Sequence, residues 1–584
     1  MDYPTMKTKA DNQIAPAQSN YDVVICGGGL AGQTLGRQLK LTLPQLSILI
    51  LEKGLFPKPH ALATVGESTI ETSSFYLGDV LQLRDHLEDD HLRKFGLRFL
   101  WTDEEACLAD QPEIGLSNFA SFISYQIDRG KLENHLYVEN QAMGIEQKTG
   151  VSVQDIDLNT GDTLHQVRYQ VSDHSDVEHT VTTRWVIDAM GRRRYIHKKL
   201  NNLLPSKRVH SSAWFHIEGL LDIADIVPDA QQHWHQRVPS SKRLYATNHL
   251  MGDGYWVWII PLSSNYTSIG IVASEPFHEI ADFSTLETAM DWLYDMEPVL
   301  YEHLQKYPVA DFGAIRDFTF SAKQVFSHDR WACTGDSALF SDPFYAPGMA
   351  MVSYQNTMIT TMIELDHEGQ LNEGLVQQYD AFVRGVNEYD TYLIQTPYDY
   401  FEHPHIFSFR FLWAFALATG LTYPQAFNQL YLYPDMNEQM RQIVGHVAGW
   451  AFRLEFFFKD WAARTQNRFS FQFIDYLSLD FLRTLYDQNT KPYDDFATVL
   501  ENFKFAVDTL EEFVQIIFLF AVRDVMPEEE SKFPTPLWIN PQAISLNPAR
   551  WAQDGLFQTK STPRDLSEMQ TQIESLYIFD EQPA

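Results

Sequence analysis

The feature that most constrains this chain is the segment YDVVICGGGLAGQTLGRQLK, where an apolar run leads into a glycine-rich turn and then a helical pattern. Gly27, Gly29 and Gly32 have G-x-G-x-x-G spacing. The first glycine makes a tight turn, the second admits a pyrophosphate to the backbone, and the third lets helix and strand pack closely. A second apolar run, LSILILEK, ends at Glu52, where a carboxylate can accept a hydrogen bond from a ribose hydroxyl. The segment predicts a β-α-β unit that binds a dinucleotide.

The rest of the chain divides by its hydrophobic pattern. Residues 20–205 and 311–390 alternate strand and helix patterns and predict the nucleotide-binding domain. Residues 206–310 show period-two alternation, which predicts an inserted β-sheet domain for the substrate. Residues 391–584 are mainly helical and rich in aromatic side chains, so we expect a helical region that covers the substrate site. Residues 1–19 have no apolar segment of a secretory signal and predict a disordered tail.

Charge, cysteine content and hydropathy narrow the class of protein. The 584 residues carry a formal net charge of -33, which repels nucleic acid and anionic lipid, so neither is an expected partner. Cys26, Cys107 and Cys333 are too few, and odd in number, for a disulfide scaffold and indicate a reducing compartment. No uninterrupted apolar run reaches the roughly 18 residues of a membrane span. We therefore expect a soluble, cytoplasmic monomer or homodimer.

Two further motifs concern the cofactor. Gly335 and Asp336 of CTGDSALFSDPFYAPG follow a strand, and this pair resembles the second FAD fingerprint of flavin monooxygenases of the hydroxybenzoate hydroxylase type. The resemblance implies that Asp336 meets a ribityl hydroxyl and that the loop after it approaches the isoalloxazine. SYQIDRGKLENHL resembles the Asp-Arg motif of the same superfamily and puts Arg129 near the flavin. The implied fold is α/β, a Rossmann-like FAD-binding domain with an inserted β-sheet domain and a mainly helical C-terminal region.

The strand pattern GYWVWIIPL contains Trp256 and Trp258 at period-two spacing, so both rings are expected on one face of the sheet. Aromatic side chains suit half-buried strands, and core packing alone accounts for such a pair. Together with Ile260 and Pro261, however, the two spell W-x-W-x-I-P, which resembles the signature of flavin-dependent halogenases. In that family the tryptophans separate flavin from substrate.

The same family requires a lysine, and its position follows a GE-small-T motif. This chain has GEST from Gly66 to Thr69, which includes Glu67, and then Lys94 before the alternating segment FGLRFLW. A lysine that enters a strand is most often simply solvated. By resemblance, FADH2 forms a flavin hydroperoxide that oxidises halide, and Lys94 hydrogen-bonds the hypohalous acid or forms a haloamine. The resemblance also assigns Glu67 to the cofactor site.

One loop departs from the family pattern F-x-x-P-x-x-S-x-G. Phe340, Pro343 and Gly348 match it, and the resemblance assigns Pro343 and Gly348 to the cofactor site. Ala346 stands where serine is expected, and Pro347 has no N–H group. Because backbone amides of this loop hold the halide in the family, one donor fewer weakens an anion site.

Tyr345 stands where tryptophan halogenases carry a glutamate that activates the attack. A phenol is already activated by its own oxygen. The substitution therefore disfavours tryptophan as substrate and favours a phenol or resorcinol, and it makes Tyr345 a candidate catalytic residue.

Three hypotheses follow. The first is a FADH2-dependent halogenase that acts, with chloride or bromide, on a small hydrophobic aromatic that is free or tethered to a carrier protein. A separate flavin reductase would supply the FADH2, because no second dinucleotide fingerprint is present. The second is a flavin monooxygenase of the same fold that acts on an aromatic or lipid-like substrate without halide, which Ala346 and Pro347 favour. The third is a flavoprotein without catalysis that serves as a sensor or scaffold. The sequence contains no motif for a metal site.

Overall fold

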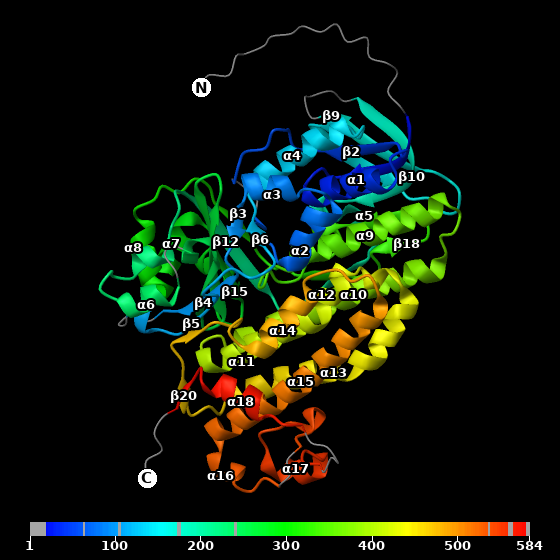
Figure 1. The fold of residues 1–584 in the computed structure, drawn as a ribbon. Coiled ribbons are helices and arrows are strands. Elements are labelled where there is room, and N and C mark those ends of the chain that lie inside the picture. The colour runs from blue at the N-terminus through cyan, green and yellow to red at the C-terminus, as the bar shows by residue number, and fades with distance from the viewer. Residues whose placement is uncertain are drawn as a thin grey trace.

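The computed structural model describes residues 19–61, 65–102, 107–171, 177–238, 242–534, 538–558 and 564–579. The predicted N-terminal tail lies outside these residues, apart from Ser19. Figure 1 shows three regions in contact: a first sheet with helices α1, α4 and α9, a second sheet with helices α6, α7 and α8, and a helical region that contains α10 to α15. The predicted fold class is confirmed.

The first sheet has the strand order β18-β19-β10-β1-β2-β7, and β8 and β9 extend it beside β10. β1 pairs in parallel with both β2 and β10, which requires crossover connections on the faces of the sheet. The apolar residues of β1 and β2 are buried on both faces, as expected for central parallel strands. Its strands are β1 (Asn20–Cys26), β2 (Ile48–Glu52), β7 (Glu146–Thr149), β8 (Val151–Asp157), β9 (His165–Val171), β10 (Glu178–Asp188), β18 (Phe326–Ser327) and β19 (Trp331–Cys333). The helices packed with them are α1 (Leu30–Thr42), α4 (Arg129–Ala142), α5 (Tyr195–Lys199) and α9 (Gly348–His367).

The second sheet has the order β16-β12-β15-β14-β13-β4-β5-β21 and is not confined to the predicted residues 206–310. β4 joins in parallel to β13, and β21 comes from the helical region. The physical reason is pairing: a sheet made only of residues 206–310 would leave the edge of β13 without backbone partners. Its strands are β4 (Leu97–Trp101), β5 (Glu113–Ile114), β12 (His210–Glu218), β13 (Thr247–Gly252), β14 (Tyr255–Leu262), β15 (Tyr266–Ser274), β16 (Gly313–Ile315) and β21 (Phe473–Ile474).

The two faces of the second sheet belong to different cores. Val257 and Ile259 of β14 pack with α7 (Leu286–Met296), which together with α6 (Gln232–Arg237) and α8 (Pro298–Leu304) covers one face. Trp256 and Trp258 point the other way and pack with the helical region. Their ring centroids lie 5.8 Å apart, so the predicted placement of both rings on one face is confirmed.

The helical region begins with α10, which packs on both β18 and α13 and thereby starts before residue 391. Its longest helices, α13 and α15, lie side by side (Figure 1). The helices are α10 (Glu373–Gln395), α11 (Pro404–Leu417), α12 (Tyr423–Phe427), α13 (Pro434–Ala462), α14 (Asp480–Asn489), α15 (Phe496–Val525), α16 (Pro527–Glu530), α17 (Pro548–Asp554) and α18 (Ser567–Glu574). Short strands β20 (Phe469–Ser470) and β22 (Ile578–Phe579) pair with each other. The other short elements are α2 (Glu71–Phe75), α3 (Arg84–Asp90), β3 (Leu92–Lys94), β6 (Ser124–Gln126), β11 (Leu203–Pro205) and β17 (Phe320–Ala322).

One stretch of the described chain, Pro404–Phe427, is long and apolar enough to cross a membrane by length and composition. It is not an uninterrupted apolar run, because polar residues such as Arg410 divide the pattern. Most of the stretch, 72% of its apolar window, is buried inside the fold, and α11 contributes Phe407, Phe411 and other side chains to the core shared with the second sheet. The stretch therefore behaves as a core helix.

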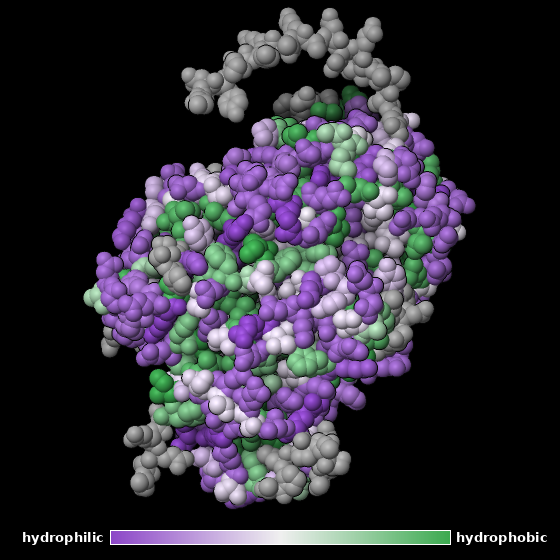
Figure 2. All heavy atoms as spheres, in the orientation of Figure 1, coloured by the Kyte–Doolittle hydropathy of each residue, from purple (hydrophilic) through white to green (hydrophobic). Residues whose placement is uncertain are grey.

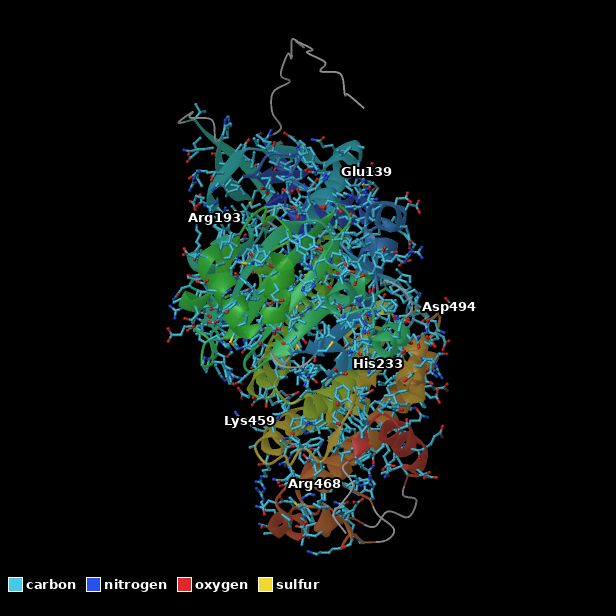
Figure 3. All side chains as sticks on the ribbon, turned by 90° about the vertical axis from the view of Figure 1, so that its left-hand side faces the viewer. Glu139, Arg193, His233, Lys459, Arg468 and Asp494 are labelled. Carbon is cyan, nitrogen blue, oxygen red and sulfur yellow. The ribbon has the colours of Figure 1, made fainter. Side chains whose placement is uncertain are left out.

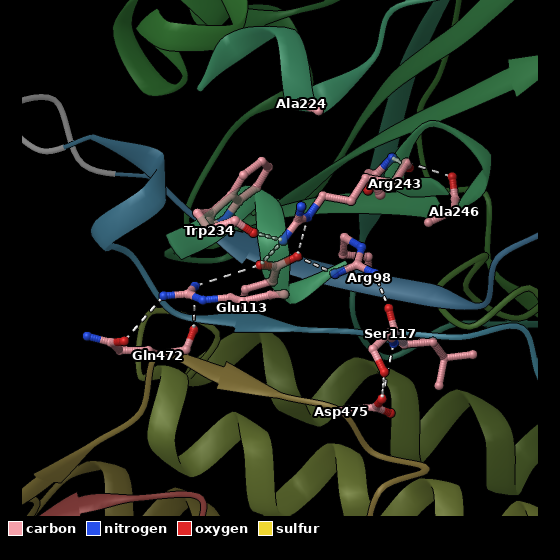
Figure 4. A network of polar contacts seen from close by, with 12 residues as sticks. Arg98, Glu113, Ser117, Ala224, Trp234, Arg243, Ala246, Gln472 and Asp475 are labelled. Atoms are coloured by element: carbon pink, nitrogen blue, oxygen red, sulfur yellow. Dashed lines mark hydrogen bonds and ion pairs between the residues drawn. The ribbon is translucent and has the colours of Figure 1, made fainter. Parts of the chain in front are cut away.

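Glu113 of β5 lies at the centre of a buried charge network (Figure 4). Its Oε1 accepts hydrogen bonds from Arg98 and, at 2.8 Å, from Nε of Arg243, while its Oε2 accepts from Nη2 of Arg243 at 3.0 Å. Arg237 reaches the same carboxylate at 3.9 Å and donates to Gln472 of the helical region at 3.2 Å. The network therefore connects β4, β5 and the segment before β21.

Many other charged side chains lie at the outside of the molecule. Arg193, Lys459 and Asp494 come from distant parts of the chain and are all exposed at the periphery (Figure 3). Hydrophilic residues cover most of the face seen in Figure 2, in keeping with the net charge of -33.

Candidate active site

The glycine turn between β1 and α1 has the geometry that its sequence predicts. Gly27 has a φ of +110°, and a Cβ added to it would lie 2.2 Å from the carbonyl oxygen of Ala189. A Cβ on Gly32 would lie 2.0 Å from the oxygen of Gly27, so only glycine allows this close packing of helix and strand. At Gly29, the residue before α1, an added Cβ would meet no atom within 4 Å. The start of α1 is thus open for a phosphate.

Glu52 ends β2 beside this turn. Its Oε2 accepts the N–H of Gly28 at 2.6 Å and its Oε1 accepts the N–H of Gly54 at 2.7 Å. These bonds orient the carboxylate at the carboxyl edge of the sheet. Glu52 therefore stabilises the turn through its backbone N–H groups, and the open space lies beside Gly29.

A cavity of about 320 Å³ runs from the glycine turn past the second sheet to the start of α9. Six of the nine predicted cofactor residues line it, namely Gly29, Glu67, Arg129, Asp336, Pro343 and Gly348. Trp256 and Trp258 also line it. Gly27, Gly32 and Glu52 shape the turn behind it. The described residues fit FAD. The turn at Gly27 and Gly32 admits only glycine, and the cavity beside it continues to the loop before α9.

The charged residues that line the cavity are Glu67, Arg129, Arg192, Asp336 and Asp342. Asp336 lines the cavity from the loop after β19. Desolvation within the protein raises the pKa of its carboxyl, while the charges of Arg192, Arg129 and Arg194 oppose that shift. Arg129 begins α4 and is held at both ends, with Nη1 donating to the oxygen of Val65 at 2.8 Å and Nη2 to Glu133 at 2.6 Å. The guanidinium is therefore positioned by fixed partners at the wall of the cavity.

Behind Glu67 lies a buried histidine between two carboxylates, which the sequence reasoning missed. His216 Nε2 lies 3.2 Å from Oε1 of Glu67, and His216 Nδ1 lies 2.8 Å from Oδ1 of Asp311. Burial by itself would lower the pKa of His216, but the hydrogen bonds to Asp311 and Glu67 outweigh it and raise the pKa to about 9. An imidazolium therefore stands behind the carboxylate that lines the cavity.

We expect His216 to make the stability of the fold decrease at alkaline pH. The folded pKa of His216 is raised above its ordinary 6.5, so its contribution is complete below about 6.5 and is lost as the pH rises through about 9. His216→Gln should abolish that decline in the thermal midpoint between pH 6 and pH 10. The matched control is His446→Gln, which changes an exposed side chain. A decline of unchanged size in the His216→Gln variant would contradict the assignment.

Trp256 is tied to the loop after β19 through buried polar groups. Its Nε1 donates to the hydroxyl of Tyr398 at 2.7 Å, and this hydroxyl donates to Oδ2 of Asp342 at 2.9 Å. His210 Nδ1 lies 2.7 Å from the same oxygen. Trp258 Nε1 donates separately to Ser268 at 3.0 Å. The two indoles are therefore fixed in orientation at the wall of the cavity.

The loop that departs from the family pattern has an unusual backbone. Tyr345 and Ala346 have φ of +68° and +55°, two successive left-handed residues without a glycine, and such outliers cluster at functional sites. The N–H of Ala346 donates to Pro343 at 2.9 Å, and that of Phe344 to Asp342 at 3.0 Å. Those two amides are used inside the loop. Tyr345 does not line the cavity, and its ring packs against Phe344.

Lys94, the last residue of β3, is buried and does not line the large cavity. Its Nζ donates to Oγ of Ser68 at 2.8 Å and to the carbonyl oxygen of Thr69 at 2.7 Å, and Ser68 does line that cavity. Burial lowers the pKa of Lys94 to about 8, while the charge of Glu71 opposes the shift. A surface lysine would lack these features, so simple solvation does not describe Lys94.

The comparisons with known proteins agree on one family. The family model of the tryptophan halogenases matches residues 109–400. A flavin-dependent halogenase of Dictyostelium discoideum, chlA, is 26% identical over 72% of this chain and 73% of its own. A 1H-pyrrole-2-carbonyl-[peptidyl-carrier protein] chlorinase of Pseudomonas fluorescens is 24% identical over 62% of this chain and 80% of its own.

Solved structures share the fold. Halogenase PltM in complex with phloroglucinol and FAD has a TM-score of 0.59 and 17% identity, over 88% of this chain and 98% of its own. The flavin-dependent brominase Bmp2 has a TM-score of 0.52 and 21% identity, over 65% of this chain and 88% of its own.

Proposed function

This chain belongs to the tryptophan halogenase family of flavin-dependent halogenases, and from that premise we propose that it halogenates an electron-rich aromatic of the phenol or resorcinol type through Lys94. FAD is its cofactor and halide its co-substrate. The observation that carries the proposal is the position of Lys94: buried, bonded to Ser68 at the wall of the large cavity, and separated by that wall from the space where FAD fits.

Reduced FAD supplies, with oxygen, the two-electron oxidation of halide to hypohalous acid. Trp256 and Trp258 form part of the cavity wall and keep an aromatic substrate out of the space beside the flavin. Their ring nitrogens are bonded to Tyr398 and Ser268, so the rings do not swing aside freely. An oxidant formed in the cavity then reaches substrate only beyond the tryptophans.

Lys94 holds the hypohalous acid on the far side of that wall. Its ammonium hydrogen-bonds the acid and donates a proton to the departing oxygen, which leaves as water. A pKa of about 8 suits this task, because the group is mostly charged at neutral pH yet is an acid strong enough to transfer its proton.

The halide site lies, in this proposal, at the start of α9. Pro343 and Pro347 have no N–H group, and the amides of Phe344 and Ala346 are used within the loop. The first N–H groups of a helix have no partner within it, and Gly348 at the start of α9 lines the cavity. A helix N-terminus attracts anions, so the helix replaces the donor that Pro347 removes.

The substrate class and the partners are parts of the same proposal. Two relatives act on pyrrole carried by a carrier protein, and one solved structure holds phloroglucinol. Tyr345 in place of a glutamate supports the phenolic class. The chain has a single G-x-G-x-x-G fingerprint, which supports a separate flavin reductase as the source of FADH2.

The test is a product mass spectrum. Purified protein, FAD, a flavin reductase and NADH are combined with resorcinols, phenols, indoles and pyrroles, with and without bromide. We expect a bromine isotope doublet on a resorcinol or phenol that requires the protein and bromide. A product heavier by one oxygen, formed equally without bromide, would overturn halogenation in favour of monooxygenation.

A further inference from the structure

A second, small cavity adjoins Lys94 and shares no lining residue with the large cavity. It is lined by Glu71, Lys94, Gly96, Leu116, Ala120, Phe122, Ser124, Phe415, Tyr476, Leu477 and Tyr486. Of the described residues that line it, only Lys94 and Glu71 carry a charge, and the others are mainly apolar or aromatic. Because Nζ of Lys94 also bonds Ser68 in the wall of the large cavity, the ammonium connects the two spaces.

Glu71, the first residue of α2, is held by two buried phenols. The hydroxyl of Tyr423 donates to its Oε2 at 2.6 Å, and that of Tyr486 donates to its Oε1 at 3.0 Å. Burial and the charge of Glu71 raise the pKa of both tyrosines far above 10, so both stay neutral donors. Each carboxylate oxygen keeps one further acceptor position. The carboxylate is therefore oriented but not saturated.

The helices around this cavity contain two π-helical segments. α2 continues directly into one at Tyr76–Val80, and α11 is joined to α12 by another at Ala418–Thr422. Such segments are rare and occur frequently at functional sites. The cavity has room for about 10 Å³, roughly one water, so an aromatic ring enters only when lining side chains move. Phe122, Phe415 and Leu477 are partly exposed, unlike Leu116 and Tyr476, so binding of a ring requires these three side chains to move.

From this arrangement we infer that Glu71 binds the hydroxyl of a phenolic substrate and accepts the proton of that hydroxyl as the ring is halogenated. The inference rests on the proposed function and deepens it. The ring carbon forms its bond to halogen as the halogen–oxygen bond breaks, and the oxygen takes a proton from Lys94 and leaves as water. Glu71 takes the phenolic proton and returns it to Lys94, which leaves a halodienone. The proton on the halogenated carbon then moves to the oxygen, so the phenol is restored with C–X in place of C–H. The net reaction converts hypohalous acid and arene into haloarene and water.

Tyr345, which occupies the position of the family glutamate, is not suited to this role. Burial raises the pKa of its hydroxyl well above 10, and its ring lies 5.9 Å from the guanidinium of Arg410 in the core of the helical region. It lines neither cavity. Glu71 supplies a carboxylate beside Lys94 from a different element of the fold.

The experiment compares the wild-type protein with Glu71→Gln, using resorcinol and its dimethyl ether, 1,3-dimethoxybenzene, with FAD, a flavin reductase, NADH and bromide. Bromination of resorcinol should fall about 10²- to 10⁴-fold, the usual contribution of a positioned general base. Bromination of the ether, which has no hydroxyl, should not change. Reduced-flavin oxidation and bromination of a soluble 1,3-diketone trap should also stay at wild-type levels, because hypobromous acid is still made.

Two further variants separate this role from a structural one. Tyr486→Phe removes one of the two donors to Glu71 and should give a smaller loss with the same selectivity for resorcinol over ether. Glu297→Gln changes a buried glutamate bonded to Thr102 and Tyr255, away from both cavities, and should leave the selectivity unchanged. The thermal midpoint of each variant identifies any loss of folding.

The outcomes distinguish the two proposals. Wild-type selectivity for resorcinol retained in a folded Glu71→Gln variant would overturn the role of Glu71 and leave halogenation standing. Bromination of indoles or pyrroles, but of no phenol, by the wild-type protein would also overturn the role of Glu71 and leave halogenation standing. Absence of any bromide-dependent product from the wild-type protein would overturn the proposed function and this inference with it.

Discussion

Lys94→Ala is expected to lower formation of halogenated product by about 10³-fold or more while oxidation of reduced flavin continues, because loss of a positioned proton donor alone accounts for 10² to 10⁴. The variant also loses the group that retains the oxidant. Hypohalous acid should then escape and halogenate a soluble trap instead of the substrate. Bromide-dependent product is measured by mass spectrometry. Oxygen consumption and bromination of the trap are measured in the same reactions.

The pH dependence identifies which form of the lysine acts. Burial lowers the pKa of Lys94 to about 8, so the ammonium form is lost as the pH rises through that value. If the ammonium holds the acid and donates its proton, halogenation falls above about pH 8 while flavin oxidation does not. A rate that rises through pH 8 would instead indicate attack by the free amine and formation of a haloamine.

The matched control is Lys148→Ala, which removes a half-buried lysine whose partner is Glu146 at 2.6 Å in the first sheet. That variant should keep wild-type halogenation. Undiminished halogenation in Lys94→Ala would refute the assignment of Lys94 and require another group to deliver the halogen.

Glu113→Ala is expected to lower the free energy of unfolding by about 3–5 kcal/mol, the usual consequence of removing one partner from a buried ion pair. Arg98 and Arg243 are themselves buried and would lose their shared carboxylate. The loss should be seen as a lower midpoint in urea or thermal unfolding. The cause is the uncompensated charge left behind, rather than the removed contact alone.

The same network makes stability fall in acid. Burial would raise the pKa of Glu113, but Arg98 and Arg243 outweigh it and hold the pKa below its ordinary 4.5. The contribution is therefore present above about 4.5 and is lost as the pH falls through the folded pKa. Glu275→Gln is the matched control, since Glu275 pairs with the exposed Arg316 and such pairs contribute about 0–1 kcal/mol. Equal losses in the two variants would contradict the role of the buried network.

Local patterns in the sequence predicted the parts of the site that lie on one element. The glycine turn was predictable because a strand, a tight turn and a helix are consecutive and the third glycine must touch the first, as Gly32 does with Gly27. The shared face of Trp256 and Trp258 followed from the period of a strand. The position of Lys94 came from a resemblance, which left its burial and partners open.

Contacts between distant segments could not be read in this way. The predicted limits 206–310 for the second sheet were too narrow, because pairing of β13 with β4 depends on backbone groups about 150 residues apart rather than on any local pattern. Glu67, His216 and Asp311 meet from three separate segments, and no spacing rule relates them.

By itself, the sequence determined the nucleotide-binding unit, the family and the face on which the two tryptophans lie, because each depends on residues within a few positions of one another. The tertiary structure alone decided that Lys94 stands between two cavities and that Glu71 shares the smaller one with it. Lys94 is buried only when α11, α14 and β3 pack together, and its pKa of about 8 follows from that burial. The chemistry of a lysine depends on its surroundings, and those come from the whole chain.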